Sequence, residues 1–116
     1  MIDFQVKLLM NLIASELGNE NNLDVHKDDD SVFVWHKDVA SLPGPHYGYG
    51  VKFNKDDNGE FVTFNVLPYV DDRPDKKYAG KDWIIKNSLM KNAPKNWEGK
   101  LAKEIVKTIK TQMDYR

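Results

Sequence analysis

The chain has 116 residues, no cysteine and a formal net charge of −1. This length predicts one domain spanning residues 1–116, and the lack of cysteine excludes disulfides, thiolate metal sites and cysteine nucleophiles. The N-terminal residues lack the pattern of a signal peptide, and no apolar run approaches the ~20 residues that cross a bilayer. We therefore expect a cytoplasmic protein without a membrane partner.

A helix is predicted over residues 3–17, because Phe4, Leu8 and Leu12 recur every four residues. Asp3 is the expected N-cap of this helix. A second set of apolar side chains fills the adjoining sector: Val6, Leu9, Met10, Ile13 and Leu17. A helix with so wide an apolar surface is expected to be buried on two sides, either by a sheet and another helix or by a second chain.

The middle of the chain contains four segments with the alternation or the apolar content of β-strands, at residues 23–26, 31–37, 46–53 and 60–66. Asn58-Gly59 lies between the last two segments, and this dipeptide is the typical turn of a β-hairpin. The hairpin is therefore the firmest local prediction. After it, residues 68–77 are expected to form a charged loop.

Two further helices are expected, from Asp82 to about Met90 and from an Asn96 cap to about Met113. In the second, apolar side chains recur every four residues: Trp97, Leu101, Ile105 and Ile109. The element order predicts an α+β fold, namely an antiparallel three- or four-stranded β-meander with an N-terminal helix and one or two C-terminal helices packed on one face of the sheet.

Tyrosine alternates with glycine next to a histidine in the segment 46–50. Glycine on one face of a strand lets a ligand or another backbone approach closely. In that case His46, Tyr47 and Tyr49, together with Trp35, would form a binding surface, since aromatic side chains dominate the energetics of interfaces. The alternative places the tyrosines in the core and the glycines beneath a helix or a large aromatic side chain.

The three histidines, His26, His36 and His46, are ten residues apart. This spacing fits neither a strand pair nor a helix face, so they would have to converge across neighbouring strands to bind a metal. The segment 54–59 imitates part of a calcium loop, but Asn65 stands where such a loop needs a bidentate glutamate. We therefore predict no metal and no cofactor.

A row of lysines occupies the outer face of the last predicted helix: Lys100, Lys103, Lys107 and Lys110. Such a basic edge suits phosphate binding, which makes nucleic-acid association an alternative function. Two glutamates interrupt the same helix, however, and a solvated lysine face serves solubility alone. Arginine, which reads phosphate and base edges better than lysine, occurs only twice in the chain.

Catalytic motifs are absent from the sequence. No serine lies in a G-x-S-x-G turn, and the paired carboxylates lie in predicted loops, where nothing desolvates them. A small hydrolase-like enzyme that uses His46 or His36 as an acid–base group, oriented by an aspartate, is a further alternative.

The leading prediction is a non-catalytic protein-interaction module, such as a small bacterial or phage accessory or regulatory protein, that binds another protein or self-associates. The small size, the lack of a catalytic motif and the wide apolar face of the first helix motivate it. The predicted binding residues are His46, Tyr47, Tyr49, Trp35, Lys100, Lys103, Lys107 and Lys110, with no catalytic and no metal residue among them.

Overall fold

Two long helices and four strands dominate the computed structural model, which describes residues 2–78, 83–84 and 97–114. In chain order these elements are α1 (Ile2–Gly18), β1 (Leu23–Lys27), β2 (Ser31–His36), β3 (Tyr47–Lys55), β4 (Phe61–Val70) and α3 (Trp97–Met113). The shorter elements are the 3-10 helices η1 (Lys37–Val39) and η2 (Lys76–Tyr78) and the two-residue strands β5 (Arg73–Pro74) and β6 (Trp83–Ile84).

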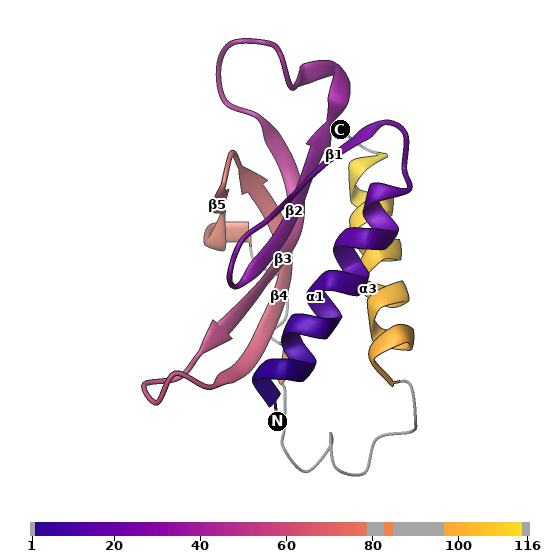
Figure 1. Cartoon of the computed structure of the whole chain (residues 1–116). Helices are drawn as coiled ribbons and strands as arrows, with labels where there is room; N and C mark the ends of the chain where they lie inside the picture. The colour runs from indigo at the N-terminus through magenta and orange to yellow at the C-terminus, as the bar shows by residue number, and fades with distance from the viewer. Residues whose placement is uncertain (1, 79–82, 85–96, 115–116) are drawn as a thin grey trace.

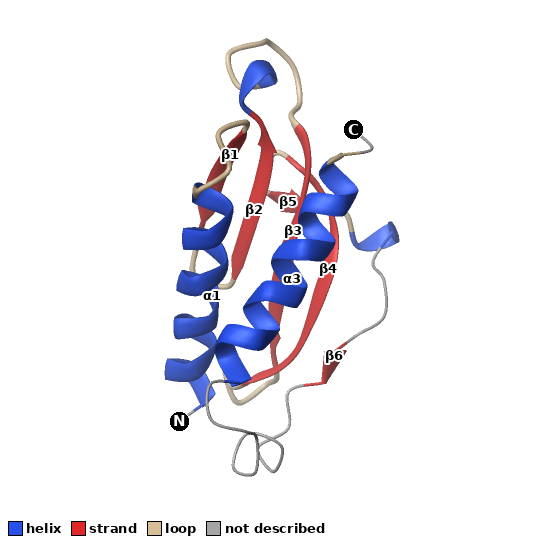
Figure 2. Ribbon diagram, turned by 90° about the vertical axis from the view of Figure 1, so that its right-hand side faces the viewer, coloured by secondary structure: helices blue, strands red, loops and turns tan. Residues whose placement is uncertain are grey.

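The elements are arranged in two layers (Figure 1). Strands β1 to β5 pair antiparallel in sequence order, and β6 pairs with β4 as well. The helices α1 and α3 run side by side across one face of this sheet, which we call the helix face (Figure 2). The segment with β5 and η2 lies on the opposite side, which we call the outer face (Figure 1). The predicted α+β meander with helices on one face is therefore confirmed.

The β3–β4 hairpin is present with the predicted turn. Residues pair from Tyr47 opposite Val70 to Lys55 opposite Phe61. In the turn the Asp56 amide donates to the Glu60 carbonyl oxygen at 2.8 Å, and Gly59 has φ of 79°. Glycine adopts this left-handed conformation without a steric penalty, which explains why the turn needs it.

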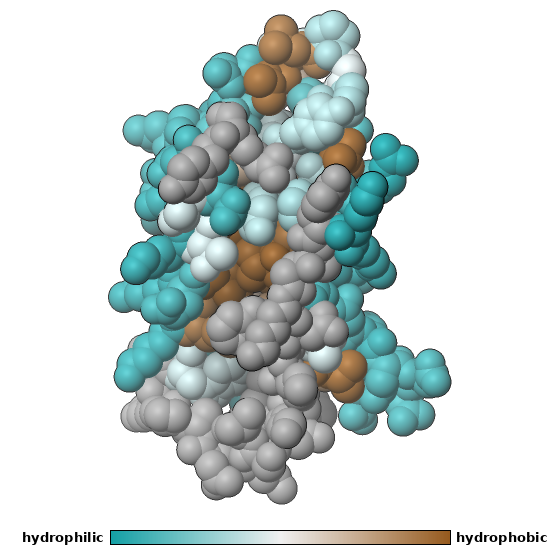
Figure 3. All heavy atoms as spheres, turned by 180° about the vertical axis from the view of Figure 1, so that it is seen from behind, coloured by the Kyte–Doolittle hydropathy of each residue, from teal (hydrophilic) through white to brown (hydrophobic). Residues whose placement is uncertain are grey.

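A single large apolar core lies between the sheet and the two helices. It contains the second set of apolar residues predicted for α1, together with alternate residues of β2 and β3, Phe61 and Phe64 of β4, and the stripe of α3 from Ala102 to Met113. Val66 and Leu101 lie at its margin, partly buried. Seen from behind, hydrophobic residues are visible in the middle of the molecule between hydrophilic flanks (Figure 3).

Two local predictions differ from the structure. Asp3 lies inside the first turn of α1 and not at its N-cap. The predicted loop over residues 68–77 is wrong, because β4 continues through Pro68 to Val70 and then turns into β5. Pro68 has no N–H to donate, but the hydrogen bond here uses its carbonyl oxygen, which accepts from the Asp75 amide at 2.8 Å. Proline is therefore tolerated at this position of β4.

The helix predicted from Asp82 to Met90 lies largely outside the described residues. The two residues described within it form β6, where Trp83 pairs with Phe64 and Ile84 with Thr63. Pairing with an open strand edge outweighs the weak helical preference of such a short stretch. Within the described part of the chain, neither long helix is both long and apolar enough to cross a membrane.

Candidate binding surfaces

Five rings pack together on the outer face of the sheet, and we call them the outer aromatic cluster: His26, Phe33, Trp35, His46 and Tyr69. The His26 and Trp35 ring centroids are 3.9 Å apart, and those of Trp35 and His46 are 4.8 Å apart. Phe33 stacks on Tyr69 at 4.8 Å with the two ring planes only 7° apart. Phe33 and Tyr69 are almost completely buried, so this cluster forms a second, smaller core.

The glycines of β3 make room for this cluster. Gly50 pairs with Phe33 of β2 and Gly48 with Tyr69 of β4. A β-carbon added at Gly50 would lie 2.6 Å from the Phe33 β-carbon, and one at Gly48 would lie 1.8 Å from the Val34 carbonyl oxygen. Both glycines are therefore required by the close approach of β2, whose backbone and Phe33 side chain leave no room for a β-carbon.

A tight turn after β4 holds His46 in place. The Asp71 backbone has φ of 54°, a left-handed conformation that aspartate tolerates better than most residues. Its carboxylate accepts a hydrogen bond from the His46 amide at 2.8 Å and lies 3.3 Å from His46 Nδ1. The Asp71 amide in turn donates to the His46 carbonyl oxygen at 2.8 Å. These contacts join the start of β3 to the end of β4.

The His46–Asp71 pair resembles the acid–base arrangement considered for an enzyme, but its free nitrogen is not accessible. His46 Nε2 and Trp35 Nε1 are buried, and none of the described residues offers either a hydrogen-bond partner. His26 Nε2 is buried too and lies 3.3 Å from a carboxylate oxygen of Asp24, close enough for an ion pair when the imidazole is protonated but not aligned for a hydrogen bond. No substrate atom can reach these nitrogens in this conformation.

The histidines do not form a metal site in the part of the chain that the structure describes, where no group of three potential ligands is found. The indole of Trp35 separates His26 from His46, and His36 lies on the helix face, where its Nε2 is 3.0 Å from the Met113 carbonyl oxygen. In the segment that imitates a calcium loop, the Asp56 carboxylate accepts hydrogen bonds from backbone amides of the turn.

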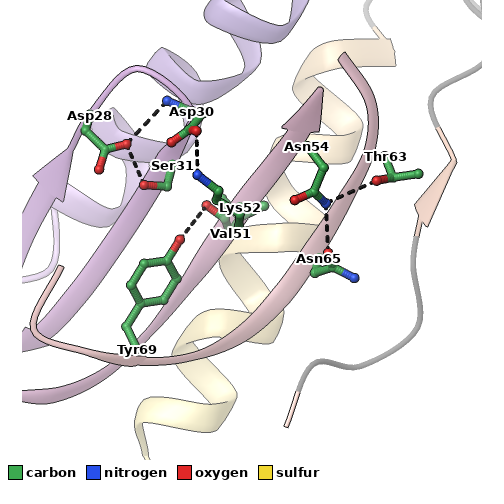
Figure 4. A network of polar contacts seen from close by, with 9 residues as sticks. All are labelled: Asp28, Asp30, Ser31, Val51, Lys52, Asn54, Thr63, Asn65 and Tyr69. Carbon is green, nitrogen blue, oxygen red and sulfur yellow. Dashed lines mark hydrogen bonds and ion pairs between the residues drawn. The ribbon is translucent and has the colours of Figure 1, made fainter. Parts of the chain in front are cut away.

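Polar side chains occupy the other end of the outer face (Figure 4). Asp28 accepts a hydrogen bond from the Ser31 hydroxyl at 2.6 Å, and Lys52 forms an ion pair with Asp30. Burial on its own raises the pKa of Asp28, but the hydrogen bonds from Ser31 and Asp30 and the charge of Lys52 outweigh it and lower the pKa overall. These contacts close the β1–β2 turn onto β3.

Tyr69 connects the aromatic and the polar parts of the outer face. Its hydroxyl donates to the Val51 carbonyl oxygen at 3.4 Å (Figure 4). Burial raises the pKa of this phenol well above its ordinary value. Farther along, the Asn54 amide donates to the side-chain oxygens of Thr63 and Asn65, across the β3–β4 hairpin.

A different kind of surface covers the solvent side of the two helices, and we call it the helix-layer surface. Phe4 of α1 is 67% exposed and Leu8, one turn later, is 39% exposed. Along α3, Lys100, Lys103 and Lys107 are exposed. Farther toward the C-terminal ends, the two helices border a shallow groove lined by Glu16, Lys103, Val106, Lys107, Lys110, Thr111 and Asp114.

The predicted binding residues are divided between these surfaces. Trp35 and His46 come together in the outer aromatic cluster, whereas Tyr49 is half-buried against the main core and Tyr47 is 59% exposed at the start of β3. Lys100, Lys103 and Lys107 are exposed on α3, whereas Lys110 is partly buried, forms an ion pair with Glu20 and borders the same small pocket as Leu23 and His36. The lysine row and the Tyr-Gly strand therefore do not make one joint site.

Sequence reasoning missed Phe33 and Tyr69 as members of the outer aromatic cluster and Asp71 as the partner of His46. The alternation of β2 and β4 contained a signal for the first two, because each places an aromatic residue on the face opposite the helices. Nothing local marks Asp71, since its contact with His46 spans 25 residues.

Comparison with known proteins gives no match to a family model, a curated protein or a solved structure, so the surfaces of this chain are interpreted from its own geometry.

Proposed function

We propose that this chain is a non-catalytic protein-interaction module that binds its partner through the helix-layer surface. The observation that carries the proposal is the exposure of Phe4 and Leu8, 67% and 39%, on a helix that buries Val6, Leu9, Met10, Ile13 and Leu17 on its opposite side. Two large apolar side chains one turn apart form a stripe that an apolar partner surface can cover. Full burial of an exposed side chain of this size supplies about 1.5–3 kcal/mol, and each of the two gains the share that is still exposed, which is larger for Phe4 than for Leu8.

The charges beside this stripe indicate the chemistry of the partner. Lys100, Lys103 and Lys107 are exposed along the neighbouring helix, and Lys7 is exposed on α1 itself. A partner that carries acidic residues around an apolar centre complements this arrangement, and such complementarity raises the rate of association. An amphipathic segment with an acidic rim has both properties.

The test compares three forms of the chain as baits in an extract of the source organism, with mass spectrometry of the bound proteins. Phe4→Ser/Leu8→Ser is expected to lose the partner that the unaltered chain retains. Leu42→Ser is the matched control, because Leu42 is 55% exposed on the loop before β3 and lies outside the helix-layer surface. Retention of the same partner by the double variant would contradict the proposal, as would the absence of any partner bound by the unaltered chain.

Nucleic-acid association is a second candidate, supported by the exposed row of Lys100, Lys103 and Lys107. Electrophoretic shifts of single-stranded and duplex probes test it. Binding should weaken steeply as salt rises, because each phosphate contact releases counterions, and Lys103→Glu/Lys107→Glu should abolish it. If the unaltered chain shifts neither probe in low salt, this candidate is eliminated.

A further inference from the structure

Strand β1 forms one margin of the sheet. It pairs with β2 alone, and in the described part of the chain no strand pairs with its other edge. Figures 1 and 2 both show β1 as the outermost strand on this side, with α1 as its neighbour on the helix face. An open edge presents unpaired backbone N–H and C=O groups to any strand that can align with them.

The hydrogen-bond pattern identifies which backbone groups face outward. The Asp28 amide donates to the Ser31 carbonyl oxygen at 3.0 Å, and the Lys37 amide donates to the Asn22 carbonyl oxygen at 2.9 Å. Along an antiparallel strand, residues whose backbone groups bond to the neighbouring strand alternate with residues whose groups do not. Every second residue of β1, including Asp24 and His26, therefore bonds to β2. The N–H and C=O groups of Val25 and Lys27 therefore point away from the sheet.

The three central residues of β1, Asp24 to His26, are self-complementary. In an antiparallel pairing of two copies about a two-fold axis at Val25, each Val25 faces its counterpart, and each Asp24 faces His26 of the second copy. Asp24 and His26 both lie on the outer face, opposite Trp35 and Phe33 of β2. Each Asp24 carboxylate already lies 3.3 Å from His26 Nε2 of its own chain, and the axis places it beside the imidazole of the second copy as well, at positions where cross-strand side chains are closest.

From this register we infer that two copies of the chain pair through the open edges of their β1 strands and form one continuous antiparallel sheet. Charged side chains often protect strand edges from pairing. Here the alternation of Asp24 with His26 instead favours an antiparallel second copy, because a parallel pairing in register would place Asp24 beside Asp24. The second copy is thereby favoured over an unrelated extended peptide, whose side chains have no reason to match.

The pairing of two β1 strands is expected to be weak, because the interface is small. β1 has only five residues, and such a strand pair buries less than the roughly 1,200 Å² at the lower end of standard interfaces. The dimer should therefore form reversibly and only as the protein concentration rises. It uses a surface separate from Phe4 and Leu8, so it stands independently of the proposed partner binding.

Sedimentation velocity up to millimolar concentration tests the inference. The unaltered chain should shift from monomer toward dimer, and Val25→Pro should stay monomeric because proline removes the outward N–H group without touching the bonds to β2. Val25→Thr keeps that N–H and the branched shape, and it should dimerise like the unaltered chain. Phe4→Ser/Leu8→Ser should leave dimerisation unchanged, which separates this result from the test of partner binding.

Amide hydrogen exchange of the unaltered chain gives a readout that needs no variant. Raising the concentration should slow exchange at the Val25 and Lys27 amides, whereas Asp24 and His26, already bonded to β2, should change little. Hydrogen exchange thus tests the pairing of the β1 edges even if Val25→Pro fails to fold. A chain that stays monomeric at millimolar concentration, or a dimer whose formation leaves the Val25 and Lys27 amides unprotected, would overturn the inference.

Discussion

The two faces of the sheet are closed in different ways. The helix face is covered by side chains of α1 and α3, whose apolar stripes project onto alternate residues of the strands. The outer face has no long helix among the described residues, and it is closed by rings lying across the glycines of β3 and by the turn that leads to β5. The packing of the helix face therefore depends on large apolar side chains that fill the space, whereas the packing of the outer face depends on the absence of side chains at Gly48 and Gly50.

The largest expected effect is the loss of volume on the helix face. Ile13 is completely buried between α1 and the sheet, and Ile13→Ala should lower the free energy of unfolding by about 2–5 kcal/mol because it leaves a cavity. Leu8→Ala, on the exposed side of the same helix, is the control and should cost much less. Urea unfolding followed by circular dichroism measures both, and equal losses would show that α1 does not pack as described.

On the outer face the addition of a methyl group should be harmful. Gly50→Ala places a β-carbon 2.4 Å from the Val32 carbonyl oxygen, so the strands must separate, at a cost of about 1–3 kcal/mol. Gly18→Ala is the matched control, since no atom outside its own helical turn and chain neighbours lies within 4 Å of the added carbon. Thermal unfolding should distinguish the two substitutions clearly. A Gly50→Ala protein as stable as the unaltered chain would refute the close packing of β2 and β3.

The smallest expected effect at neutral pH concerns Tyr69. Tyr69→Phe removes one hydrogen bond, to the Val51 carbonyl oxygen, and should cost about 0.5–1.5 kcal/mol. Because burial raises the pKa of this phenol, the unfolded chain loses the proton first, and stability should fall as pH rises above the ordinary value of 10.0.

The pH dependence separates this contribution from that of the other tyrosines. Unfolding in urea at a series of pH values from neutral to strongly alkaline should show a shallower decline for Tyr69→Phe than for the unaltered chain. Tyr47→Phe is the control, because Tyr47 is exposed, and it should leave the slope unchanged. Identical slopes for all three proteins would mean that Tyr69 is not buried in the folded state.

Local patterns were sufficient to predict the two long helices and the hairpin. The four-residue recurrence in α1 and α3 and the alternation on both sides of Asn58-Gly59 report side-chain periodicity, which is a property of neighbouring residues. The same alternation also left two interpretations of the Tyr-Gly strand open. The structure supports packing beneath aromatic rings for the glycines, while Tyr47 remains exposed and Tyr49 is half-buried.

The candidate surfaces depended much more on contacts between distant segments. His46 meets Asp71 across 25 residues, and β6 forms only because β4 has an edge to pair with. The exposure of Phe4 and Leu8 likewise follows from where α3 lies beside α1, since periodicity counts apolar residues without saying which of them a neighbour covers.

Composition and periodicity alone determined that this chain has amphipathic helices and an antiparallel hairpin, because those features follow from side-chain spacing within about ten residues. Only the folded chain decided that the sheet has a second aromatic core on its outer face, that the lysine row and the Tyr-Gly strand lie apart, and that the β1 edge is open. These features arise from packing between segments far apart in the chain, and no local pattern of residues encodes such contacts.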